Sequence, residues 1–260
     1  MNLRVSLGQM DPIKGEPETN FATAAAMAAE ASRRGSHLLM LPELWGSGID
    51  VTRHEEHASA TGQGLFARAA ALAAEHGLAI CGSLLSTAAG GNANTIAFFG
   101  LDGRIVTEYS KLHLFRLMDE DKWLVPGNRP ALAEGPWGLA GLAICYDLRF
   151  PELFRHYALA GARLIFLPSA WPHPRLIHWR TLLRARAIEN QMFVVACNRV
   201  GTSDGTAFFG HSSVIDPWGE LLVEAGEQPG LFTVDLDLTQ VEAIRKQIPV
   251  FQDRRTDIYG

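Results

Sequence analysis

Cysteine is scarce in this chain of 260 residues, and its three copies stand far apart. They form no CxxC pair, so the sequence indicates neither a disulfide framework nor a zinc ribbon. The nine histidines include no HExxH motif, and the closely spaced ones lack cysteine or carboxylate neighbours at the separations of a zinc site. We therefore expect a protein without a bound metal. The three cysteines are Cys81, Cys145 and Cys197.

Positive charge is also in short supply, with 23 Lys and Arg residues against 28 Asp and Glu residues and a formal net charge of -5. This balance lacks the basic footprint of a nucleic-acid binder, so a small molecule is the expected partner. No stretch approaches the roughly 20 consecutive apolar residues that cross a bilayer. The first ten residues, MNLRVSLGQM, alternate as a strand does and do not resemble a secretory signal. These absences predict a cytoplasmic protein that binds neither nucleic acid nor membrane.

Several familiar catalytic motifs are missing as well. There is no G-x-S-x-G nucleophile elbow and no G-x-x-x-x-G-K-[ST] phosphate loop. Gly46 and Gly48 are not followed by the third glycine of a dinucleotide-binding fingerprint. A Cys-His dyad stays open, although no histidine has a distinguishing setting in the sequence.

What the sequence does contain is a regular alternation of short apolar runs and helical segments. The pattern predicts an α/β or mixed α+β fold with enough strands for two sheets. No linker rich in Pro, Ser and Gly divides the chain, so we expect one domain over residues 1–260. The predicted helices are Pro17–Arg34, Gly64–His76, Pro151–Ala160, Ile177–Asn190 and Thr239–Lys246. The predicted strands are Leu3–Gln9, His37–Leu41, Leu78–Cys81, Thr95–Phe99, Ile105–Tyr109, Leu139–Cys145, Leu164–Leu167, Phe193–Cys197, Ser213–Ile215, Leu221–Val223 and Leu231–Val234.

The pentapeptide GLAIC occurs twice, ending once at Cys81 and once at Cys145. The first copy continues as GSLLS, which reads as more strand, whereas the second continues as YDLRFPEL, which turns toward a helix. A nucleophile at a strand-to-helix turn is held rigidly and meets backbone N–H groups that can bind an oxyanion. We interpret Cys81 and Cys197 as small buried core residues. Cys145 is a candidate nucleophile if a base and an electrophilic group accompany it, with a buried core residue as the alternative.

A catalytic thiol needs activation by other groups, because its ordinary pKa is about 8.5. Two segments share the pattern G-x-x-L-x-x-L-P-x-x-W, one beginning at Gly35 and the other at Gly161, and each ends a predicted strand with a polar residue. The first of them places Glu43 at the mouth of a strand as a candidate base, with a turn N-cap as the alternative reading. Lysine occurs only four times. Lys111, in EYSKLHLF, is the candidate cation, with a solvated surface lysine as the alternative.

Together, the motifs LPELWGSG, YSKLHLF and AICYDLRFPEL resemble those of the nitrilase, or carbon-nitrogen hydrolase, superfamily, and the likeness covers almost the whole chain. That family uses a Glu-Lys-Cys triad, so the resemblance implies that Glu43 is the base, Lys111 the cation and Cys145 the nucleophile. It places a second family glutamate on Glu120, where it would position the lysine or the substrate. It also implies a four-layer α-β-β-α sandwich with two mixed sheets flanked by helices, no cofactor, and a homodimer or larger homo-oligomer.

The segments KLHLFRLMDE, CYDLRFPEL, HWRTLLRARAIENQ and CNRVG are most similar to the omega-amidase branch of this family, which deamidates 2-oxoglutaramate and related monoamides of dicarboxylic acids. The resemblance thus implies hydrolysis of a small carboxylate-bearing amide through a cysteine thioester. We expect Arg175 to bind the substrate's carboxylate, and Tyr146 and Trp171 to form pocket walls; a surface arginine and core aromatics are the alternatives. Other functions stay open: deaminated glutathione amidase, N-carbamoyl amino acid amidohydrolase, nitrilase, or a binding protein without turnover.

Overall fold

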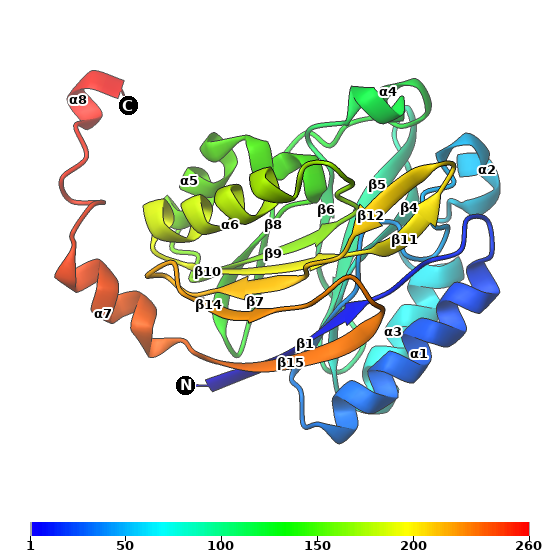
Figure 1. Ribbon diagram of the computed structural model, residues 1–260, viewed down its shortest axis with the longest axis horizontal. Coiled ribbons are helices and arrows are strands. Elements are labelled where there is room, and N and C mark those ends of the chain that lie inside the picture. The colour runs from blue at the N-terminus through cyan, green and yellow to red at the C-terminus, as the bar shows by residue number, and fades with distance from the viewer. Residues whose placement is uncertain (1, 260) are drawn as a thin grey trace.

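Two mixed β-sheets form the centre of the molecule, in a computed structural model that describes residues 2–259 (Figure 1). In the first sheet the strand order is β15-β1-β2-β3-β5-β4, with β6 paired to β5. The three strands β1, β2 and β3 run parallel, and the remaining pairs are antiparallel. The strands of this sheet are β1 (Asn2–Gln9), β2 (Leu38–Met40), β3 (Ala79–Cys81), β4 (Ser83–Ala88), β5 (Gly91–Phe99), β6 (Ile105–Ser110) and β15 (Gly230–Asp237).

The second sheet has the order β14-β13-β10-β9-β8-β7, and its central strands β8, β9 and β10 run parallel. A separate two-stranded ribbon pairs β11 with β12. The strands of the second sheet are β7 (Leu132–Gly135), β8 (Gly138–Leu142), β9 (Leu164–Ser169), β10 (Phe193–Asn198), β13 (Ser213–Ile215) and β14 (Leu221–Glu224). The ribbon strands are β11 (Val200–Ser203) and β12 (Thr206–Phe209).

The space between the sheets is filled by apolar side chains from both of them. Leu7 and Met40 from the first sheet and Leu142 from the second belong to one buried cluster. The rings of Phe98 in β5 and Phe166 in β9 stack with their centroids 5.5 Å apart, so the two sheets are in direct contact. A core shared by both sheets is what the expected single domain requires.

Helices cover the outer face of each sheet (Figure 1). On the first sheet, α1 buries Ala24, Ala28 and Ala31, which recur at helical spacing and let the helix approach closely. The predicted sandwich, with helices flanking two mixed sheets, is confirmed. The helices are α1 (Pro17–Arg33) and α3 (Gly64–His76) on the first sheet, and α5 (Pro151–Leu159) and α6 (Leu176–Asn190) on the second. The others are α2 (His54–His57), α4 (Glu120–Trp123), α7 (Thr239–Gln247) and α8 (Thr256–Tyr259).

The five predicted helices all form, with ends that differ by no more than one residue. The predicted strand Leu139–Cys145 is wrong at its C-terminal end, because β8 stops at Leu142. The N–H of Ile144 donates to the side chain of Asp147 at 2.9 Å, and Cys145 begins a 3-10 turn. The chain therefore leaves the sheet before the cysteine. Three strands were not predicted: β7, β11 and β12. The interpretation of GSLLS as more strand agrees with β4, which begins at Ser83.

Candidate active site

Four of the residues expected at the site converge in space from distant parts of the sequence. Glu43 follows β2, Lys111 follows β6, Cys145 follows β8, and Glu120 is the first residue of α4. All four side chains are buried, and each is at most 7% exposed. The structure thus brings together the base, the cation, the nucleophile and the second glutamate that the sequence indicated.

The backbone is strained beside three of these side chains. Leu44, Asp119 and Cys145 have φ angles of 46°, 56° and 44°, in the left-handed region that residues with a Cβ rarely adopt. Leu44 follows Glu43, Asp119 precedes Glu120, and the third residue is Cys145 itself. Such strain persists only where surrounding contacts hold it. At Leu44 the backbone N–H is held by the hydroxyl of Ser83 at 2.9 Å.

Lys111 lies between the two carboxylates. Its Nζ donates to Oε1 of Glu43 at 2.7 Å, and to Oε2 and Oε1 of Glu120 at 2.8 and 3.0 Å. The side-chain Nδ2 of Asn94 donates to the same Oε1 of Glu43 at 2.8 Å and to Oε1 of Glu120 at 3.2 Å. The N–H of Phe115 completes the set by donating to Oε2 of Glu120 at 2.7 Å. Both carboxylates are therefore fixed by several donors.

Cys145 lies beside Glu43, and both residues line one small cavity. The charge of the Glu43 carboxylate acts on the thiol. The backbone N–H of Ala170, which lines the same cavity, donates to Oε2 of Glu43 at 3.0 Å. Oε2 is therefore the oxygen of Glu43 that neither Lys111 nor Asn94 contacts.

Burial and charge together determine the protonation of the site. Burial raises the pKa of Glu43, and the positive charge of Lys111 opposes this rise. Burial and the charge of Glu43 raise the pKa of the Cys145 thiol well above its ordinary value. Burial alone would lower the pKa of Lys111, but Glu120 and Glu43 raise it well above the ordinary range. At neutral pH the lysine is thus an ammonium, and the thiol keeps its proton until a base removes it.

The two segments with the repeated pattern meet at this site. Glu43 follows the proline of the first segment, and Ser169 occupies the same place in the second. The N–H of Glu43 donates to the carbonyl of Ser169 at 3.3 Å, and the N–H of Ala170 donates to Glu43. The corresponding residues of the two segments are therefore linked by hydrogen bonds.

Two small chambers adjoin at Cys145. One, of about 30 Å³, is lined by the four converging residues together with apolar side chains such as Leu44 and Met118. The other, of about 20 Å³, is lined by Cys145 and the three predicted substrate-binding residues, and also by Arg149. Phe115 and Ala170 line both chambers. The three predicted residues are Tyr146, Trp171 and Arg175, so the structure places all of them beside the nucleophile.

The model of the carbon-nitrogen hydrolase family matches residues 4–246. The chain belongs to the carbon-nitrogen hydrolase family. It is 38% identical to the 2-oxoglutaramate amidase of Bacillus subtilis (strain 168), over all of both chains. Its structure is similar to that of a carbon-nitrogen hydrolase superfamily protein from Xanthomonas campestris with an arsenic adduct in the active site, with a TM-score of 0.92, 31% identity, and coverage of 98% of this chain and 97% of that one.

A third similar protein is a mutant amidase from Nesterenkonia sp. AN1, with the acetamide moiety of fluoroacetamide added covalently at its active-site cysteine. The TM-score is 0.88 and the identity 30%, with 99% of this carbon-nitrogen hydrolase and 95% of that chain covered.

Sequence reasoning missed several side chains that build the site of this carbon-nitrogen hydrolase. Asn94 was hidden in AAGGNAN, which reads as a hairpin or loop; the hairpin exists, but its second strand, β5, includes Asn94. Asp147 accepts hydrogen bonds from Tyr109 at 2.7 Å and from the backbone and ring of His113 at 3.1 and 2.7 Å. Because Tyr109 and His113 flank Lys111, Asp147 ties the lysine segment to the turn of Cys145. The sequence signal for this role was the acidic residue two positions after Cys145, directly after an apolar run.

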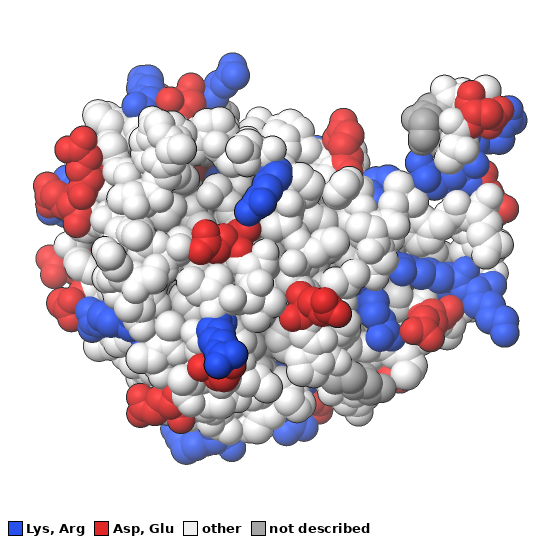
Figure 2. Space-filling model, turned by 180° about the vertical axis from the view of Figure 1, so that it is seen from behind, with Lys and Arg blue, Asp and Glu red and all other residues white. Residues whose placement is uncertain are grey.

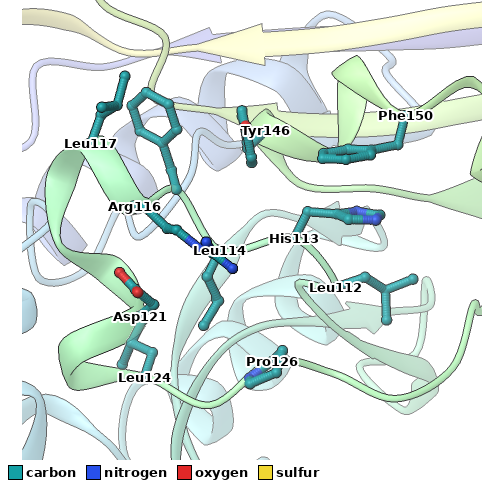
Figure 3. A pocket seen from close by; sticks show the side chains of 11 residues that line it. Leu112, His113, Leu114, Arg116, Leu117, Asp121, Leu124, Pro126, Tyr146 and Phe150 are labelled. Carbon is teal, nitrogen blue, oxygen red and sulfur yellow. The ribbon is translucent and has the colours of Figure 1, made fainter.

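A larger open groove of about 520 Å³ adjoins the second chamber and shares Phe115 and Tyr146 with it. Figure 3 shows the ring of His113 lying parallel to that of Phe150 on one side of this groove, with centroids 3.6 Å apart. The groove of this carbon-nitrogen hydrolase therefore lies beside the chamber of Cys145, and Phe115 and Tyr146 line both.

Within residues 2–259, no three side chains of His, Cys, Asp and Glu gather in a way that could hold a metal ion. Over the same residues, no helix combines the length and the apolar character that a membrane crossing needs.

Proposed function

We propose that this protein is an amidase that hydrolyses the omega-amide of a small dicarboxylic acid to the acid and ammonia through a thioester on Cys145. The observation that carries the proposal is the convergence of Glu43, Lys111 and Cys145 around one buried chamber. A thiol with a raised pKa, beside a carboxylate that can take its proton and an ammonium that can receive negative charge, suits attack on a carbonyl carbon.

In the first half of the reaction, Glu43 takes the thiol proton while the sulfur of Cys145 bonds to the amide carbon. The carbonyl oxygen becomes an oxyanion, which Lys111 and the backbone N–H of Tyr146 stabilise. The ammonium of Lys111 makes three hydrogen bonds, two of them to Glu120, so release of the longest one, to Oε1 of Glu120 at 3.0 Å, frees an N–H for the oxyanion. The loss of one such donor raises the barrier by roughly 3 to 4 kcal/mol.

The second half regenerates the enzyme. As the C–N bond breaks, the proton held on Glu43 passes to the leaving nitrogen, and ammonia departs. A water molecule then loses a proton to the same carboxylate and attacks the thioester carbon. The C–S bond breaks, the acid is released, and the thiolate of Cys145 recovers its proton from Glu43.

Two arginines beside Cys145 support a narrower substrate class, amides that carry a carboxylate at the far end. Arg175 and Arg149 both line the chamber beside Cys145, and a guanidinium binds a carboxylate through two parallel hydrogen bonds. Trp171 lines the same chamber, and its indole N–H has no hydrogen-bond partner among the described residues. The Bacillus relative is named 2-oxoglutaramate amidase, which supports an amide with a carboxylate at its far end.

The direct test is ammonia release from 2-oxoglutaramate and from succinamate by the purified protein. We expect turnover of at least one of them. A panel of deaminated glutathione, N-carbamoyl amino acids and simple nitriles tests the alternative activities. If the protein releases ammonia only from members of that panel, the substrate class is wrong although the thioester chemistry stands. If it binds these amides without turnover, it is a non-catalytic member of the fold.

The arginines give a sharper test of the carboxylate. Arg175→Ala should raise KM for succinamate about 10- to 100-fold, because a hydrogen-bonded charge is lost. The same change should leave KM for butyramide, which has no carboxylate, nearly unaltered. Arg149→Ala is assayed beside it, because Arg149 lines the same chamber and its guanidinium lies 4.8 Å from the ring centroid of Trp171. Equal effects on both substrates would show that Arg175 supports the fold and does not bind the carboxylate.

We further propose a cytoplasmic enzyme that works as a homodimer or larger homo-oligomer. Several large apolar side chains on α6 and near β14 are exposed, which favours a partner surface: Ile177, Ile188, Trp218, Leu221 and Leu222. On the face drawn in Figure 2, acidic and basic side chains are interspersed among wide areas of other residues. This mixture favours a small-molecule substrate over nucleic acid. Sedimentation at several concentrations measures the assembly.

A further inference from the structure

Asn94 occupies the centre of the catalytic cluster without facing the chambers. It lies in β5, is completely buried, and its backbone carbonyl accepts the N–H of Lys111 at 2.9 Å. Its side-chain amide reaches both carboxylates, as described above. One residue thus fixes the backbone of the lysine and the side chains of both glutamates.

The hydrogen bonds divide the two oxygens of Glu43 between different tasks. Oε1 accepts from both Lys111 Nζ and Asn94 Nδ2, which occupies its two lone pairs. Among the described residues Oε2 accepts only from the N–H of Ala170, which leaves one of its lone pairs open. A proton from the thiol can therefore be received on Oε2 without breaking an existing hydrogen bond.

The charge balance of the cluster explains why a neutral donor is needed there. Two carboxylates and one ammonium leave an excess of one negative charge in a buried site. A primary amide has two N–H groups, so a single Asn94 side chain can serve both carboxylates without adding charge. The Oδ1 atom of Asn94 has no hydrogen-bond partner among the described residues. The side chain therefore acts in the cluster only as a hydrogen-bond donor.

We propose that Asn94 is a positioning residue that, with Lys111, saturates Oε1 of Glu43 and so directs the Cys145 proton to Oε2. In this step the S–H bond breaks, an O–H bond forms on Oε2, and the sulfur lone pair bonds to the substrate carbon. The inference rests on the proposed function only in assigning the thiol proton to Glu43.

The experiment compares Asn94→Ala and Asn94→Asp with the wild-type protein and with Asn92→Ala. Asn92 lies two residues earlier on β5, and its side chain bonds to His54 at 2.7 Å, away from the cluster. The first readout is the rate of Cys145 alkylation by iodoacetamide from pH 4 to pH 10, measured by peptide mass spectrometry. The second is the pH profile of kcat/KM for ammonia release from succinamate. Alkylation needs no amide turnover, so it tests Asn94 even if the proposed function fails.

We expect Asn94→Ala to move the acid limb of both profiles to higher pH by about one unit, because ionised Glu43 loses one donor. The value of kcat should fall about 10-fold with little change in KM. Asn94→Asp has nearly the same shape but adds a carboxylate, so its limb should move further. Asn92→Ala should follow the wild type.

Several outcomes would overturn the inference. A profile for Asn94→Ala that superimposes on that of the wild type, with only a lower melting temperature, would leave Asn94 with a structural role. If the acid limb of the Asn94→Asp profiles moved to no higher pH than that of Asn94→Ala, the charge at position 94 would not affect the protonation of Glu43. A wild-type alkylation profile without an acid limb would show that Glu43 does not receive the proton. If Asn94→Ala does not fold, the nearly isosteric Asn94→Asp carries the comparison.

Discussion

After Cys81 the chain continues through Gly82 into β4, whereas the second GLAIC leaves the sheet after Leu142 and its Cys145 begins a 3-10 turn. The preceding four residues are the same in both places. Cys81 packs in the core between the sheets, with its pKa raised well above its ordinary value by burial. Burial likewise raises the pKa of Cys145, so burial does not distinguish the two thiols. The neighbours of each sulfur do.

The continuation of the first segment nevertheless contributes to the site. Ser83 holds the strained turn that follows Glu43. Gly82 lies so close to Trp45 and Leu41 that an added Cβ would approach their atoms to 3.0 and 2.8 Å. The first GLAIC therefore precedes residues that support the turn after Glu43, and the second ends at Cys145 in its 3-10 turn. The same five residues lead to two different parts of one active site because the chain turns differently after each of them.

The largest expected effect separates the two cysteines by activity. Cys145→Ala should lower kcat for ammonia release by at least about 10⁴-fold, because no other group can form the thioester. Cys81→Ala should keep activity within about threefold of the wild type, since it only removes a buried sulfur. Both variants are assayed with the same amide, and the thioester is sought by mass spectrometry. If activity survived in Cys145→Ala and vanished in Cys81→Ala, the nucleophile would be the other cysteine.

The second-largest expected effect is on stability and comes from the charged residues around Cys145. Lys111→Met should lower the free energy of unfolding by about 3 to 5 kcal/mol at pH 8, because two buried carboxylates lose their cation. Without Lys111 the pKa of Glu43 rises further above its unfolded value. The loss is therefore complete above the folded pKa and is relieved as the pH falls through it. Urea unfolding at pH 8 and pH 5.5 measures the difference.

The double variant Lys111→Met with Glu120→Gln is the control for that prediction. It removes one carboxylate together with the cation, so part of the stability at pH 8 should return while activity stays absent. If the single variant were as stable as the wild type at both pH values, the ion pairs would contribute nothing to the folded state.

The two segments also show what could be predicted from the sequence. The helix Gly64–His76 was predicted without error because Gly77, in the left-handed conformation, marks its end. The end of β8 was predicted wrongly, because the apolar run continues through Ile144 whereas the turn depends on a hydrogen bond to Asp147. Glu43, Lys111 and Cys145 carry recognisable motifs, whereas Asn94 does not. Its role arises only from contacts with side chains 51 and 26 positions away in the chain.

The glycine that begins each GLAIC is needed for a different reason, and replacing it should have a smaller effect on stability. Gly141 lies under Tyr157 and Ile165, and an added Cβ would come within 2.5 Å of both. Gly141→Ala should therefore cost about 1 to 3 kcal/mol through overpacking. Gly77 has open space around it but a φ of 56°, so Gly77→Ala should cost only about 1 kcal/mol. Gly77→Asn should recover part of that loss. Equal costs for the two alanine variants would contradict the distinction between space and conformation.

The smallest effect tests the strain at the nucleophile by comparing Ala with Gly at each cysteine. At position 145 the φ of 44° suits glycine, so Cys145→Gly should be about 1 kcal/mol more stable than Cys145→Ala. Position 81 lies in β3, where glycine loses more backbone entropy, so Cys81→Gly should be about 0.5 to 1 kcal/mol less stable than Cys81→Ala. Urea unfolding of the four variants measures both differences. Opposite signs would show that the second GLAIC holds its cysteine in a strained conformation that the first does not need. The same sign at both positions would mean that Cys145 is held without strain and that its partners alone set it apart.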